Sequence, residues 1–149
     1  MCSIGVMGGF LISGSWDKTA RVWRNEASVL VLSGHAAAIW AVAFLGPPTD
    51  SVNDMTLLTA SADKTVQMWR GNTSVRTYKG HTDCVRALAV CPDRQRFLSA
   101  ANDATIRLWA VAGQSLATFY GHSNYIYRFG PAAFGFFFDF SCKNSINAM

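Results

Sequence analysis

Three histidines stand in similar surroundings and have the partners that acid–base chemistry requires. His35, His81 and His122 each follow a glycine, and an aspartate that stands six residues before a tryptophan belongs with each of them. A histidine held by an aspartate next to a serine is the arrangement by which many hydrolases activate their nucleophile. The residue types therefore raise the hypothesis of a catalytic triad.

The repetition of this residue set argues against catalysis. The segments SWDKTARVW, SADKTVQMW and ANDATIRLW begin at residues 15, 61 and 101, and a Gly-His pair follows twelve or thirteen residues after each tryptophan. An enzyme needs one site, whereas residues that build a fold recur with the repeat. The chain also has no P-loop, no GxSxG motif and no carboxylate pair at a telling spacing. We therefore predict no catalytic residue and no enzyme.

The repeat predicts the elements that position these residues. Self-similarity at about 40–45 residues, with Gly-His before and Trp at the end, is typical of four-stranded propeller blades. In such a blade we expect the aspartate in the turn between the second and third strands and the histidine on the entering loop. A hydroxyl on the second strand, Thr59 or Ser61 in one repeat and Ser99 in the next, would join the imidazole to the indole. The predicted structural network is Asp17, Trp23, His35, Thr59, Ser61, Asp63, Trp69, His81, Ser99, Asp103, Trp109 and His122.

The predicted fold class is all-β, a partial β-propeller with two complete four-stranded blades plus parts of two more. The blades cover about residues 10–33, 38–79 and 84–120, and a further blade starts at 125–128. Residues 1–9 fit no strand of the repeat, so we expect the first blade to lack its first strand. Residues 129–149, a Phe-rich tail, also lie outside the pattern.

Composition excludes several classes of protein. The 149 residues are 50% hydrophobic and 15% charged, which suits one domain with a packed core. The 13 basic residues are scattered, so we expect no nucleic-acid partner. We expect no signal peptide, because no basic region precedes the apolar residues at the N-terminus. The longest apolar stretch, residues 129–140, is too short to cross a bilayer, so no membrane partner is expected.

The four cysteines show no CxxC pairing, and His81 and Cys84 lack a second ligand pair for zinc. We expect no metal, no cofactor and a reduced setting, cytoplasmic and also nuclear.

These motifs resemble the WD-repeat family from Phe10 to Tyr127, although Arg24, Arg70 and Ala110 stand where that family often has Asp after Trp. The segments AANDATIRLW and YGHSNYIY are also similar to the N-terminal propeller of the phospholipase A-2-activating protein family, which are ubiquitin-binding adaptors. The resemblance implies a non-catalytic protein-interaction module that binds ubiquitin or ubiquitinated proteins in ubiquitin-dependent protein degradation and ubiquitin recycling. No contact with the AAA ATPase called valosin-containing protein is expected, because the family's domain that makes this contact is absent.

The resemblance also implies that the chain is a piece of a propeller, since propellers use four to eight blades. One hypothesis is a truncated or mis-spliced product, or a gene-model error, without function; the alternative is an isoform with a hydrophobic tail. A generic WD-repeat scaffold for another complex is the second functional interpretation.

A partner is expected on the top face, where the loops entering the inner strands and the turns after the second strands meet. Aromatic residues and Arg are enriched at interface hot spots, and ubiquitin offers an apolar patch ringed by positive charge. In the alternative interpretation, Trp40 and Tyr127 simply pack within an inner strand. The predicted partner-binding residues are Trp16, Trp40, Arg86, Asn102, Tyr125 and Tyr127.

Overall fold

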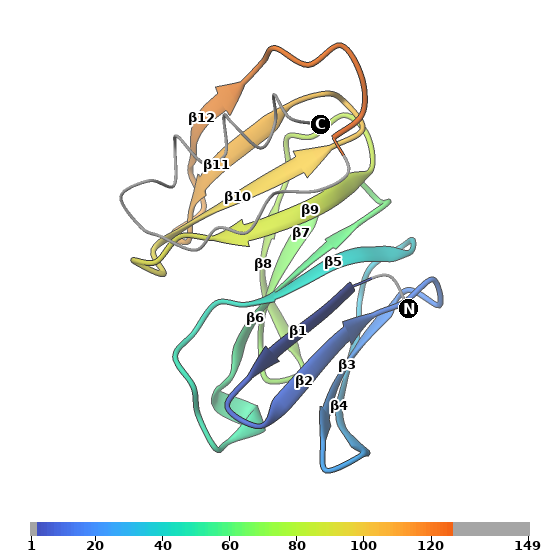
Figure 1. Cartoon of the computed structure of the whole chain (residues 1–149), viewed down its shortest axis with the longest axis vertical. Coiled ribbons are helices and arrows are strands. Elements are labelled where there is room, and N and C mark those ends of the chain that lie inside the picture. Colours follow the sequence, from blue (N-terminus) through green and yellow to red (C-terminus); the bar gives the residue numbers. More distant parts are fainter. Residues whose placement is uncertain (1–2, 127–149) are drawn as a thin grey trace.

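The computed structural model describes residues 3–126, which form twelve strands in three antiparallel sheets of four. Figure 1 shows the sheets following one another along the long axis of the molecule. The first sheet holds β1 (Ser3–Met7), β2 (Phe10–Gly14), β3 (Thr19–Arg24) and β4 (Ala27–Ser33). The second holds β5 (Ile39–Phe44), β6 (Thr56–Ser61), β7 (Val66–Arg70) and β8 (Thr73–Tyr78). The third holds β9 (Val85–Val90), β10 (Arg96–Ala101), β11 (Ile106–Ala110) and β12 (Ser115–Phe119).

Each sheet is a meander in which consecutive strands pair, so the order in space follows the order in sequence. The first strands β1, β5 and β9 lie next to one another where the blades meet. A register shift recurs opposite Trp23, Trp69 and Trp109, where the third strand pairs with the fourth. The all-β, partial propeller predicted from the repeat is thus confirmed, with three four-stranded blades among the described residues.

The turn between the second and third strands follows from local chemistry. The Asp17 carboxylate accepts hydrogen bonds from the backbone N–H and the hydroxyl of Thr19, at 2.9 and 2.6 Å. The residue between them, Lys18, has a φ of 72°, in the left-handed region that tight turns use. Asp63 and Asp103 bind Thr65 and Thr105 in the same way. The D-x-T spacing of the repeat is therefore the sequence of this turn.

The prediction that residues 1–9 lie outside the repeat is wrong. β1 pairs with β2 over its whole length, from Ser3 opposite Gly14 to Met7 opposite Phe10, and completes the first blade. The segment was missed because it carries no Gly-His pair and only a short alternation of apolar and polar residues. A strand of five residues is specified largely by the strand it pairs with.

The core lies between the blades. Phe10, Ile12 and Val22 of the first blade pack against Leu57 and Trp69 of the second. The opposite face of the second blade buries another set against the third: Leu58, Ala60, Val66 and Tyr78 against Phe97 and Trp109. The second blade is thus covered on both faces, which explains why β6 is buried from Leu57 to Ser61.

The connection between β5 and β6 is a long loop, residues 45–55, and it includes a 3₁₀ turn, Val52–Asp54. At the other end, Ile126 donates a backbone hydrogen bond to Ala101 and packs against the third blade. The rest of the predicted fourth blade and the Phe-rich tail lie outside the described residues. Within residues 3–126 we find no helix with the length and hydropathy that a bilayer crossing requires.

Candidate functional site

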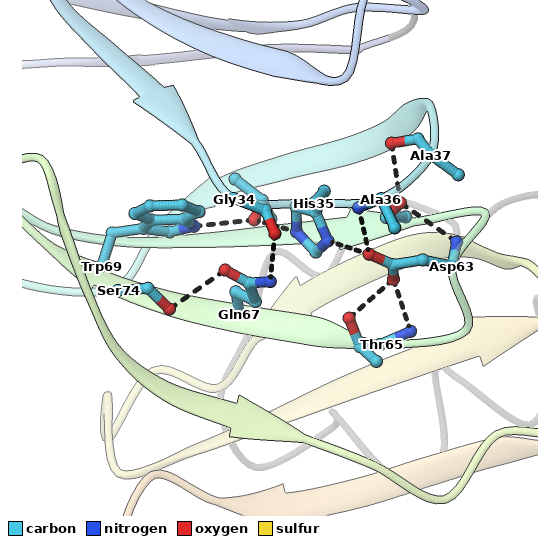
Figure 2. A network of polar contacts seen from close by, with 11 residues as sticks. Gly34, His35, Ala36, Ala37, Asp63, Thr65, Gln67, Trp69 and Ser74 are labelled. Atoms are coloured by element: carbon cyan, nitrogen blue, oxygen red, sulfur yellow. Dashed lines mark hydrogen bonds and ion pairs between the residues drawn. The ribbon is translucent and has the colours of Figure 1, made fainter.

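A chain of hydrogen bonds runs through the second blade (Figure 2). His35 contacts the Asp63 carboxylate through Nδ1 and the Thr59 hydroxyl through Nε2, both at 2.7 Å. The Trp69 indole donates to the same hydroxyl at 2.8 Å. Because the indole can only donate, Thr59 accepts from it and gives its own proton to Nε2, which leaves the imidazole proton on Nδ1, facing Asp63. This is the order of contacts expected from the repeat.

The third blade repeats the chain with serine in place of threonine. His81 contacts Asp103 at 2.8 Å and the Ser99 hydroxyl at 2.7 Å, and Trp109 donates to Ser99 at 2.8 Å. Burial lowers the pKa of His81, although Asp103 opposes this. Burial alone would raise the pKa of Asp103, but its hydrogen bonds from Thr105 and His81 outweigh burial and hold it below the usual value. The pair is therefore a neutral imidazole beside a carboxylate.

These networks have the members of a hydrolase triad but not its accessibility. The Thr59 and Ser99 hydroxyls belong to residues with 0% exposure, and each already receives an indole proton. A catalytic nucleophile must reach its substrate, and these buried hydroxyls cannot. Their role is to hold the strands of a blade in place.

Ser61, offered as an alternative to Thr59, has a different role. Its hydroxyl donates to the Ala37 carbonyl at 3.0 Å and accepts the backbone N–H of Asp63 at 3.1 Å. Ser61 stands at the end of β6, where the strand enters the turn, two residues beyond Thr59. The hydroxyl that contacts His35 is therefore that of Thr59.

The expectation that each of the three histidines has its own aspartate is wrong within the described chain. In the first blade Trp23 donates to Ser13 at 2.9 Å, but no imidazole reaches Ser13 or Asp17. His122 has a buried Nε2 with no hydrogen-bond partner among the described residues. The aspartate of each blade binds the histidine of the loop that precedes that blade. Because of this offset, Asp17 has no histidine and His122 has no aspartate among the described residues.

The top face brings together four of the predicted partner-binding residues from three blades. Trp16, in the first blade, packs edge-to-face on Trp40 of the second, with ring centroids 5.1 Å apart. The Arg86 guanidinium of the third blade lies over the Trp40 ring, 4.0 Å from its centroid, and its Nε donates to Asn102 at 3.1 Å. Trp16 is 68% exposed, whereas Trp40 is half-buried between its neighbours. We call Trp16, Trp40, Arg86 and Asn102 the aromatic ladder.

The remaining predicted partner-binding residues stand apart or are not described. Tyr125 is half-exposed beyond the third blade, and Tyr127 lies outside the described residues. Sequence reasoning missed the ties between blades at the opposite end, where Arg76 and the Tyr78 hydroxyl both donate to the Val111 carbonyl. Both residues lie on the outer strand β8, at positions where the other blades have apolar or small side chains. This difference between the repeats is the signal from which the contacts could have been predicted.

No group of three or more His, Cys, Asp or Glu suited to a metal ion occurs among residues 3–126. Cys84 and Cys91 are both buried, and burial raises the pKa of the Cys84 thiol.

Three stacked meanders, two of which contain an Asp–His–hydroxyl–Trp chain of hydrogen bonds, define a piece of a β-propeller built from WD repeats. The model of the family described as "WD domain, G-beta repeat" matches residues 2–24, 26–70 and 72–110, and the chain belongs to this family. Protein DOA1 of Saccharomyces cerevisiae is 40% identical over 85% of this chain and 17% of its own length. Phospholipase A-2-activating protein of Xenopus laevis is 54% identical over 37 residues, 25% of this chain and 5% of its own length.

The crystal structure of the WD40 beta propeller domain of Doa1 has the same fold. It superposes with a TM-score of 0.76 at 41% identity, over 85% of this chain and 41% of that chain. The chain thus spans less than a fifth of the curated relatives it matches and less than half of a propeller domain.

Proposed function

We propose that this chain is part of a non-catalytic interaction module that binds ubiquitin or ubiquitinated proteins through the aromatic ladder. The single observation that supports this is the convergence of Trp16, Trp40 and Arg86 from three blades on one surface. The similarity to Doa1 and to phospholipase A-2-activating protein supports a ubiquitin-related adaptor as the setting.

The chemistry of the ladder suits an apolar patch on a folded partner. Trp16 is 68% exposed and has a support, because it packs edge-to-face against Trp40, whose ring the Arg86 guanidinium also contacts. A supported aromatic side chain loses little conformational entropy on binding. Trp and Arg at the centre of a patch are the residue types that contribute most to interfaces.

A titration of isotope-labelled ubiquitin with the 149-residue chain, followed by NMR, tests this proposal. We expect Trp16→Ala to weaken binding by at least about tenfold, because the anchor is removed while its supports remain. Trp40→Ala should do the same by loosening both neighbours. Leu116→Ala, at a half-exposed apolar side chain on the outer strand β12, is the matched control and should leave the affinity unchanged. Equal affinity in both tryptophan variants would contradict the assignment.

A further inference from the structure

The first blade packs against the second blade through one face only. The side chains that it buries there are 0–1% exposed: Phe10, Ile12, Ala20, Val22 and Leu32. Its other face carries the tryptophan of the blade. In the next two blades the corresponding face is covered, since Trp69 and Trp109 are 1% and 2% exposed. The first blade lies at one end of the molecule (Figure 1), and no residue among 3–126 covers its tryptophan face to that extent.

This tryptophan face of the first blade is largely apolar. Trp23 donates to Ser13 across it, which defines the side of the sheet, and strand pairing with the alternation of side chains adds the other members. We call the whole set the open face: Ile4, Val6, Leu11, Ser13, Arg21, Trp23, Val29 and Val31. Four of its aliphatic side chains, Ile4, Val6, Val29 and Val31, are 40–73% exposed. A contiguous exposed apolar patch of this kind marks an interaction surface.

The open face is arranged symmetrically about one row of residues. The row consists of residues that pair directly across the four strands and point to the opposite side of the sheet: Gly5, Ile12, Val22 and Leu30. Each member of the open face stands one residue to one side of this row and has a counterpart one residue to the other side. The pairs are Ile4 with Val6, Ser13 with Leu11, Arg21 with Trp23, and Val31 with Val29.

We propose that the open face binds the open face of a second copy of this chain, about a two-fold axis that follows this row. The strands of the two sheets then run antiparallel, within the roughly 30° at which two sheets pack face to face. The axis exchanges the two members of each pair, so each side chain lies on the counterpart of its own position. Because the same patch supplies both sides of the contact, the dimer is closed and leaves no open face.

The chemistry of the pairs favours a second copy as the occupant. Arg21 is the one charged member of the open face, and the axis places its guanidinium over the Trp23 indole of the second copy. The indole reaches across the sheet to Ser13, so the ring extends over the surface where the cation arrives. A guanidinium over an indole face is a favourable contact. The exposed aliphatic side chains match in the same way, since Val6 lies on Ile4 of the second copy and Val31 on its Val29.

The test measures the mass of the 149-residue chain by light scattering after size exclusion, over a wide range of concentrations. We expect a concentration-dependent species of about twice the 16.2 kDa chain mass. Oligomers larger than two are not expected, because two open faces cover each other.

Substitutions on the open face should weaken the dimer. Val6→Lys and Val31→Lys each put an unpaired ammonium into the contact twice, so each should weaken it by at least about 100-fold. Arg21→Met keeps an apolar stem but loses the cation, and should weaken it by about 30-fold, since the guanidinium–indole contact occurs twice. Val75→Lys, at a half-exposed valine on the outer strand β8, is the matched control and should leave the dimer unchanged.

Mixing Ile4→Lys with Val6→Glu tests the antiparallel register. Each variant alone should form little dimer, because an unpaired charge enters both copies of this contact. In a mixed dimer, one contact joins the new ammonium to the new carboxylate, and the other joins an intact Ile4 to an intact Val6. The mixture should therefore associate more strongly than either variant alone.

Circular dichroism of each variant checks that the blades remain folded, and Val31→Lys, on a different strand, repeats the test if a substitution in β1 unfolds the sheet. Four outcomes would each overturn the proposal: a monomer at every concentration, oligomers larger than two, a control variant as weak as Val31→Lys, or a mixture no stronger than its components.

Discussion

Thr59 is the residue on which the second blade's polar network depends. Its hydroxyl satisfies both the Trp69 indole and the His35 ring, in a site without solvent. Thr59→Val keeps the shape but leaves two buried polar groups without partners, so we expect a loss of about 2–5 kcal/mol in the free energy of unfolding. Urea denaturation followed by tryptophan fluorescence measures it.

The control for this prediction is Ser61→Ala, two residues along the same strand. Ser61 bonds to a backbone carbonyl and a turn N–H rather than to the imidazole, so its loss should cost about 1 kcal/mol. Equal losses in the two variants would contradict the assignment of Thr59 to the network.

The histidine–aspartate pairs predict a pH dependence of stability. Because the pKa of His81 is lowered in the folded state, the unfolded chain binds more protons, and the free energy of unfolding falls as the pH drops below about 6.5. The lowered pKa values of Asp63 and Asp103 add a second loss as the pH falls below about 4, where the unfolded carboxyls take up protons first. Urea midpoints measured from about pH 7.5 down to 3.5 test both steps. A flat profile between about pH 7.5 and 5.5 would contradict the first.

At the scale of elements, the approach of one blade to the next depends on a small residue in β2. A Cβ added to Gly14 would lie 2.8 Å from the Ile39 side chain and 3.2 Å from its carbonyl oxygen. Gly14→Ala therefore requires β5 to move, and we expect a loss of about 1–3 kcal/mol from overpacking.

Thermal unfolding measures this loss, and Gly46→Ala serves as the comparison. A Cβ at Gly46 would have Thr56 as its nearest neighbour, at 3.3 Å, next to an exposed loop, so a smaller loss is expected there. A larger loss at Gly46 than at Gly14 would show that the distance between β2 and β5 does not limit stability.

At the scale of the whole molecule, stability is expected to be uneven. Repeat proteins gain much of their stability from contacts between neighbouring units, and the second blade has a described neighbour on both faces. We expect backbone amides in β6 to exchange with solvent most slowly, and amides in β4, which is exposed along most of its length, to exchange fastest. Hydrogen exchange followed by mass spectrometry measures this order. Equal protection in the two strands would indicate that the blades unfold as one unit.

The sequence alone was sufficient for most of the strands, the turns and the Asp–His–hydroxyl–Trp order, because these follow from short spacings. An alternating strand and a D-x-T turn are specified within about five residues of chain. The sequence did not show whether Thr59 or Ser61 contacts the histidine, since residues two apart in a strand point to the same face. The strand Ser3–Met7 lacked any motif, and only its pairing with β2 defines it.

The tertiary structure decided which residues meet across blades. Trp16, Trp40 and Arg86 are far apart in sequence, and they form one ladder because a turn of the first blade and the starts of β5 and β9 reach the same end of the stack. The same offset decided that His35 serves Asp63 rather than Asp17, which binds Thr19 but no histidine, and that His122 Nε2 has no hydrogen-bond partner among the described residues. Spacing specifies a blade, but the packing of one sheet on the next determines which blade a loop residue belongs to, and that depends on buried contacts between distant segments.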